Sequence, residues 1–165
     1  MCSGISLKPL ILGGGQEFGL RSGTESVAAA AGLAKALDIA QQSRVPETRR
    51  LQALRDLFIS ELKKQVPLAV TNGSAKHRTP HIINLTLPAY DNERLMIQLD
   101  EAGIQAAVGS ACSAAGTEPS HVLKAIGLSD EEARSSLRFS LGRPTTREQI
   151  LKTVKTLADL TGSNR

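Results

Sequence analysis

Two segments in the second half of the chain alternate between apolar and polar residues, and this alternation constrains the fold more than any other feature. A period of two residues is typical of β-strands with one face in the core. The apolar positions are Ile83, Leu85 and Leu87 in residues 81–87, and Leu137, Phe139 and Leu141 in residues 136–141. The segments around them have helical spacing. The sequence therefore predicts an α+β fold in which helices pack on one face of a short mixed sheet.

Periodicity and capping residues predict the remaining elements. Helices are expected at residues 27–42, 47–66, 91–102, 119–126 and after Thr145, and short strands at 68–71 and 104–108. Ser22 with Glu25 and Ser129 with Glu132 match the capping box that starts many helices, and Thr145 with Glu148 matches a third. Glycines at 13–15 interrupt the first 21 residues, which are predicted to be extended.

Composition excludes several classes of protein. The 165 residues include 41% hydrophobic and 22% charged residues, which are values typical of a globular domain. A net charge of +4 with interleaved acids, and only 2% aromatic residues, argue against nucleic-acid binding. Two cysteines do not form a disulfide scaffold, and the N-terminus shows neither a signal peptide nor a membrane span. We therefore expect a cytoplasmic protein.

Cys112 is the candidate nucleophile, because small residues surround it between Gly109 and Gly116. Its thiol is either a packed, inert group or a reactive thiolate, and the second requires a nearby cation or helix N-terminus. Arg138 and His121 are candidate cations for this purpose. Arg138 lies between two serines on the polar face of its strand, where it is either solvated or bound to a substrate carboxylate.

Thr24 is a candidate anion-binding residue, because it would lie in the first turn of the helix after residue 26. The alternative is that Ser22 and Thr24 only cap this helix. His77 and His81 have the spacing of two metal ligands on a helix, but Pro80 between them excludes a helix, and no metal site is predicted.

Two long motifs carry a family resemblance. GGGQEFGLRSGTESV and GSACSAAGTEPSHVLKAIGLSDEEARSSLRFSLGRPTT, with the spacing between them, resemble the C-terminal part of cysteine desulfurases. That family has the class V aminotransferase fold, depends on pyridoxal phosphate, and supplies sulfur for iron–sulfur clusters and tRNA thiolation. The resemblance implies that residues 46–165 form the small C-terminal domain of a fold-type I pyridoxal phosphate enzyme, with the catalytic-cysteine loop. It implies that residues 1–45 are a remnant of the large-domain and dimer-interface segment with its linking helix.

The resemblance also implies roles for single residues. Cys112 matches the nucleophile that takes sulfur from L-cysteine, becomes a persulfide and leaves alanine. Arg138 matches the arginine that holds the substrate carboxylate, and Thr24 matches the threonine that reaches the cofactor phosphate of the partner subunit in a homodimer. The expected partners are L-cysteine and sulfur-acceptor scaffold proteins.

The chain departs from the family at its beginning. Family members carry the Schiff-base lysine and a neighbouring histidine upstream of the segment that matches Gly13–Gly15, and Lys8 has no such context. The chain is therefore predicted to be inactive without a missing N-terminal cofactor-binding half. The alternatives are a non-enzymatic persulfide carrier, a scaffold-binding adaptor, or a remnant without activity.

Overall fold

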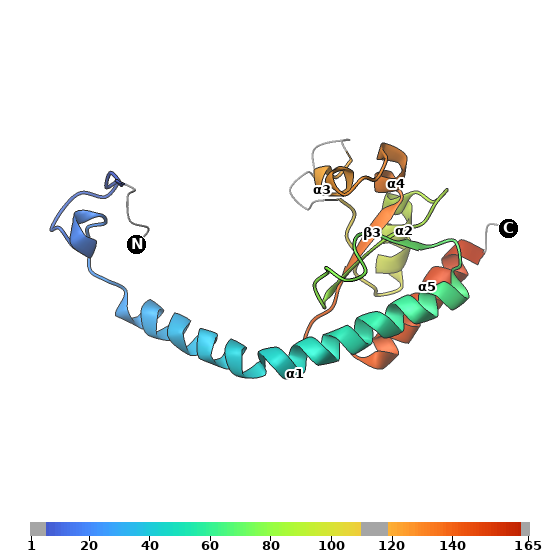
Figure 1. Cartoon of the computed structure of the whole chain (residues 1–165), viewed down its shortest axis with the longest axis horizontal. Helices are drawn as coiled ribbons and strands as arrows, with labels where there is room; N and C mark the ends of the chain where they lie inside the picture. Colours follow the sequence, from blue (N-terminus) through green and yellow to red (C-terminus); the bar gives the residue numbers. More distant parts are fainter. Residues whose placement is uncertain (1–5, 110–118, 163–165) are drawn as a thin grey trace. The chain divides into compact units, whose positions relative to one another are not determined.

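The computed structural model describes residues 6–109 and 119–162 (Figure 1). It divides into two compact units, with the boundary between Arg44 and Val45. The elements in chain order are η1 (Glu17–Gly19), α1 (Val27–Gln65), β1 (Val70–Thr71), β2 (Ile82–Thr86), α2 (Asn92–Glu101), α3 (His121–Ala125), α4 (Asp130–Arg134), β3 (Ser136–Ser140) and α5 (Arg147–Gly162). None of the helices in these residues is long and apolar enough to cross a lipid bilayer.

A single helix, α1, replaces the two helices predicted at 27–42 and 47–66, and Pro46 lies inside it. An internal proline lacks the N–H that would bond to the fourth preceding carbonyl, at a cost of about 3 kcal/mol. The residues on both sides are mostly Ala, Leu, Gln and Arg, which are strong helix formers, and no glycine separates them. The prediction of two separate helices is therefore wrong.

Ser22 does not cap α1, although its spacing predicted this. The helix begins at Val27, so Ser22 and Thr24 both precede its first turn. The Ser22 hydroxyl instead accepts a hydrogen bond from the Gly15 N–H (3.4 Å), and its own N–H donates to the Ile11 carbonyl (3.1 Å). Ser22 therefore closes the glycine-rich loop before the helix.

The sheet of the second unit has the order β1-β2-β3, and all its pairs are antiparallel. The α+β class is confirmed, but the expectation of a mixed sheet is wrong for the described strands. The strand predicted at residues 104–108 is reduced to an antiparallel bridge between Ala107 and Arg138 of β3.

The hydrophobic core lies on one face of this sheet, as predicted. Alternate residues of β2 and β3 pack there against α2, α5 and the last turns of α1. The most deeply buried side chains are Phe58, Leu62, Val66, Ile83, Leu85, Leu87, Leu99, Leu137, Val154 and Leu157. The rings of Phe58 and Phe139 are tilted, with their centroids 5.3 Å apart. The opposite face of β2 and β3 carries mostly polar residues, with Ile82 at the start of β2 as its apolar member.

Helix α4 begins with the predicted capping box. The Ser129 hydroxyl accepts a hydrogen bond from the Glu132 N–H (3.2 Å), and the Glu132 carboxylate accepts one from the Ser129 N–H (2.7 Å). The predicted box at α5 is displaced by one residue, since Thr146 and Gln149 exchange the reciprocal bonds. Thr145 instead accepts a hydrogen bond from the Gly142 N–H (2.9 Å).

The α4 cap predicts a pH dependence of stability. The Ser129 N–H, followed by the Ser129 hydroxyl, holds the pKa of Glu132 below its usual value. A carboxylate with a lowered folded-state pKa stabilises the fold above its unfolded pKa, and this contribution disappears as the pH falls through the folded pKa. We expect Glu132→Gln to be less stable than the wild type at neutral pH, and the difference to shrink in acid. Thermal unfolding of both proteins between about pH 7 and pH 3 measures this; a difference that stays constant over the range contradicts it.

Candidate functional site

Arg138 lies at the centre of β3, directly opposite Asn84 of β2. Its backbone N–H donates to the Ala107 carbonyl (2.8 Å), and its carbonyl accepts from the Ala107 N–H (3.0 Å). The backbone of Arg138 is thus paired with β2 on one side and with Ala107, five residues before Cys112, on the other. Because side chains alternate along a strand, the half-buried Arg138 side chain belongs to the polar face, away from the core.

A cluster of four polar residues occupies this face beside Arg138. The Asn72 amide nitrogen donates to the Asn84 side-chain oxygen (2.6 Å) and to the Thr86 hydroxyl (2.9 Å). The Thr86 and Ser136 hydroxyls are 2.9 Å apart, and the Ser136 hydroxyl also donates to the Glu132 carbonyl (2.7 Å). Alternation placed three of these residues on the polar face. Asn72 follows the strand predicted at residues 68–71, and its contact with residues far along the chain leaves no local sequence signal.

The Arg138 guanidinium has no hydrogen-bond or ion-pair partner within residues 6–109 and 119–162. It is also permanently charged, and its planar N–H groups match a carboxylate with two parallel hydrogen bonds. A half-buried guanidinium that the described residues leave unpaired is suited to bind a small anion.

Of the three predicted site residues, Arg138 alone lies in the described part of the second unit. Cys112 lies outside the described residues, although it follows Ala107, the bridge partner of Arg138, by only five positions. Thr24 is exposed and lies in the first unit, whereas Arg138 lies in the second. His121 is the first residue of α3 and is exposed. The expectation that Thr24 lies in the first turn of a helix is wrong.

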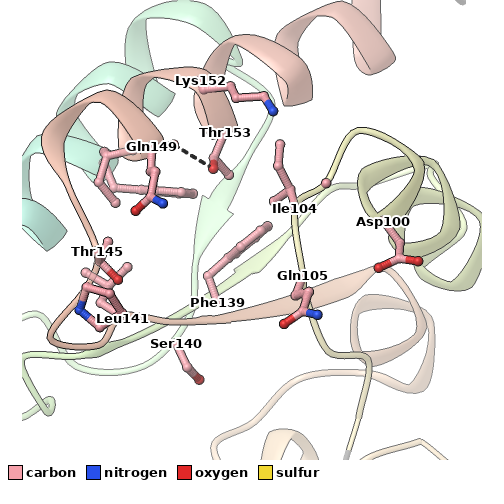
Figure 2. Close-up of a pocket in the computed structure, with 14 residues that line it drawn as sticks. Asp100, Ile104, Gln105, Phe139, Ser140, Leu141, Thr145, Gln149, Lys152 and Thr153 are labelled. Carbon is pink, nitrogen blue, oxygen red and sulfur yellow. Dashed lines mark hydrogen bonds between the residues drawn. The ribbon is translucent and has the colours of Figure 1, made fainter.

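A cavity of about 460 Å³ lies in the second unit, between the end of α2, β3 and the first turns of α5 (Figure 2). Buried apolar side chains such as Phe58 and Phe139 form its inner wall, and polar groups such as Gln149 and Lys152 form its rim. The Lys152 amine donates to the Ala102 carbonyl (2.9 Å). Neither Arg138 nor Thr24 lines the cavity. The candidate functional site is therefore the Arg138 face of the sheet.

Comparison with known proteins decides the family. The family model for class-V aminotransferases matches residues 7–152, which is most of the chain. The chain belongs to the class-V aminotransferase family. This family membership confirms the predicted resemblance and agrees with the α+β architecture of the second unit.

Relatives of the chain include cysteine desulfurases. Cysteine desulfurase IscS 1 of Archaeoglobus fulgidus is 43% identical over 154 residues, covering 93% of this chain and 40% of that protein. A human cysteine desulfurase is 39% identical over 151 residues, covering 92% of this chain and 33% of that protein. The X-ray structure of a NifS-like protein from Rickettsia africae has a TM-score of 0.77 and 29% identity, covering 96% of this chain and 41% of that chain. The chain thus spans between 33% and 41% of the length of these relatives.

Pyridoxal phosphate is the cofactor that the family implies. Such enzymes hold it through a Schiff base with a lysine amine, which a desolvated environment activates. The chain has eight lysines, and all of them are exposed. The described residues therefore do not fit the cofactor by themselves.

Proposed function

We propose that the chain is the cysteine-bearing portion of a cysteine desulfurase. The main support is that the chain is about 40% identical to cysteine desulfurases over about nine-tenths of its own length. In the proposed reaction the thiol of Cys112 and L-cysteine give a Cys112 persulfide and L-alanine. The carbon–sulfur bond of the substrate breaks and a sulfur–sulfur bond forms. The persulfide keeps one thiol hydrogen, and the substrate carbon takes the other.

Arg138 binds the substrate carboxylate in this proposal. Its guanidinium is half-buried, lies on a polar face and lacks a partner among the described residues. Cys112 follows Ala107, the bridge partner of Arg138, by five residues, and five residues of extended chain span at most about 18 Å. This length allows a thiol to approach a substrate bound at Arg138.

The relatives are longer than this chain, which covers 40% of the Archaeoglobus fulgidus protein. In this proposal a portion like the uncovered part of that protein would supply the Schiff-base lysine, and Thr24 would hold the cofactor phosphate of the partner subunit in a homodimer. The persulfide sulfur passes to acceptor scaffolds for iron–sulfur cluster assembly or to tRNA thiolation in the cytoplasm. The isolated chain is inactive as a desulfurase, which agrees with the exposure of every lysine.

A reconstitution experiment tests this function. The chain is mixed with the remaining portion of the Archaeoglobus fulgidus relative, pyridoxal phosphate and L-cysteine, and alanine formation is measured. We expect alanine only when both parts are present. Cys112→Ala should abolish it, whereas Cys2→Ala, the matched change at the other cysteine, should leave it unchanged. Equal alanine formation without the chain, or with Cys112→Ala, contradicts the proposal.

A second candidate function is a persulfide carrier or a scaffold-binding adaptor without catalysis of its own. The lack of an enclosed lysine among the described residues favours it. A carrier would accept sulfur from a low-molecular-weight persulfide and transfer it to an acceptor protein without gaining desulfurase activity in the reconstitution. The two candidates therefore differ in whether alanine is formed.

A further inference from the structure

The polar cluster lies beside an Arg138 guanidinium that has no hydrogen-bond or ion-pair partner in the described part of the chain. Asn84 is the residue directly opposite Arg138, and both side chains are on the same face of the sheet. Directly opposite residues in an antiparallel pair have Cβ atoms about 4.5–5.5 Å apart. An asparagine side-chain oxygen at that distance is within reach of an arginine and is an ordinary acceptor for its N–H groups.

Asn72 donates a hydrogen bond to the Asn84 side-chain oxygen. Its amide nitrogen lies 2.6 Å from the Asn84 side-chain oxygen, and its backbone N–H donates to the Asn84 carbonyl (2.9 Å). The Asn72 amide is bonded in turn to Thr86, whose hydroxyl lies 2.9 Å from the amide nitrogen and 3.1 Å from the amide oxygen. The Asn84 oxygen is thereby directed along the sheet toward Asn72.

We propose that Asn72 is a positioning residue that holds the Asn84 side-chain oxygen away from Arg138, and so keeps the guanidinium available for a carboxylate ligand. This inference rests on the proposed role of Arg138 in carboxylate binding. Without Asn72, the Asn84 oxygen accepts a hydrogen bond from Arg138 and competes with the ligand. A net hydrogen bond of ordinary strength corresponds to an affinity about 2- to 10-fold weaker.

Nuclear magnetic resonance of the full 165-residue chain tests the inference. The observed signal is the Arg138 Nε–H resonance, identified by its loss in Arg138→Lys. We expect Asn72→Ala to displace this resonance, and the double variant Asn72→Ala/Asn84→Ala to return it to the wild-type position. A general loosening of the sheet would not be reversed by a second truncation. An unmoved resonance in Asn72→Ala, or a displaced one in the double variant, overturns the inference.

Asn84→Ala alone covers the case in which Asn72→Ala fails to fold. We expect it to leave the Arg138 resonance in place, because the Asn84 oxygen is already bonded to Asn72. A displaced resonance would show that Asn84 already bonds Arg138 and would overturn the inference.

Titration with acetate tests the proposed role of Arg138 separately. An Arg138 resonance of the wild type that does not respond to acetate counts against carboxylate binding, while the response to Asn72→Ala in the absence of acetate still decides the role of Asn72.

Discussion

Replacing Arg138 with alanine is expected to lower kcat/KM for L-cysteine roughly 10- to 150-fold in the reconstituted enzyme. The reason is the loss of charge-assisted hydrogen bonds to the carboxylate, which contribute about 1.5–3 kcal/mol. Arg138→Lys should fall between the wild type and the alanine variant, because lysine keeps the charge but loses the bidentate geometry. Steady-state alanine formation over a range of L-cysteine concentrations measures the effect.

Arg134→Ala is the matched control for this prediction. Arg134 lies four residues earlier, at the exposed end of α4, and its replacement should leave kcat/KM unchanged. An Arg138→Ala enzyme with the wild-type KM would show that the carboxylate binds elsewhere, and the candidate site on this face of the sheet would then be wrong.

Phe58→Ala is expected to destabilise the second unit by about 3–5 kcal/mol, the range for truncating a buried phenylalanine. Phe58 is 1% exposed and packs against Phe139 under the sheet. The change removes apolar contacts and leaves a cavity between α1 and the strands. Urea unfolding followed by circular dichroism measures the loss as a lower midpoint.

The same substitution at Phe18 is the matched control. Phe18 is 90% exposed in the first unit, so Phe18→Ala should leave the midpoint unchanged. Equal midpoints for Phe58→Ala and the wild type would contradict the packing of α1 against the sheet.

The sequence predicted the elements that are determined by residues close together in the chain. The alternation in residues 136–141 recurs in β3, and the Ser129 capping box recurs at α4, because both depend on residues within one element. The polar face of Arg138 follows from the same alternation. The residues around Cys112 and Thr24 left a functional and a structural interpretation open for each, and the family resemblance implied their specific roles.

The features that the sequence did not predict depend on contacts between distant residues. Residues 104–108 lie beside β3, at the edge away from β2. This position depends on the order of the strands in the sheet, which no single segment encodes. Asn72 bonds to Asn84 and Thr86, which follow it by 12 and 14 residues. The helix through Pro46 is an exception, because it depends on the balance between one lost hydrogen bond and the propensity of the other residues of the same helix.

The central claim is that Cys112 receives sulfur from L-cysteine. After the reconstituted mixture has reacted with L-cysteine, alkylation and mass spectrometry of the digested chain locate the added sulfur. The account predicts a persulfide on the peptide that contains Cys112, none on the peptide that contains Cys2, and a greatly reduced amount with Arg138→Ala. Alanine formation without a persulfide on Cys112 would contradict it.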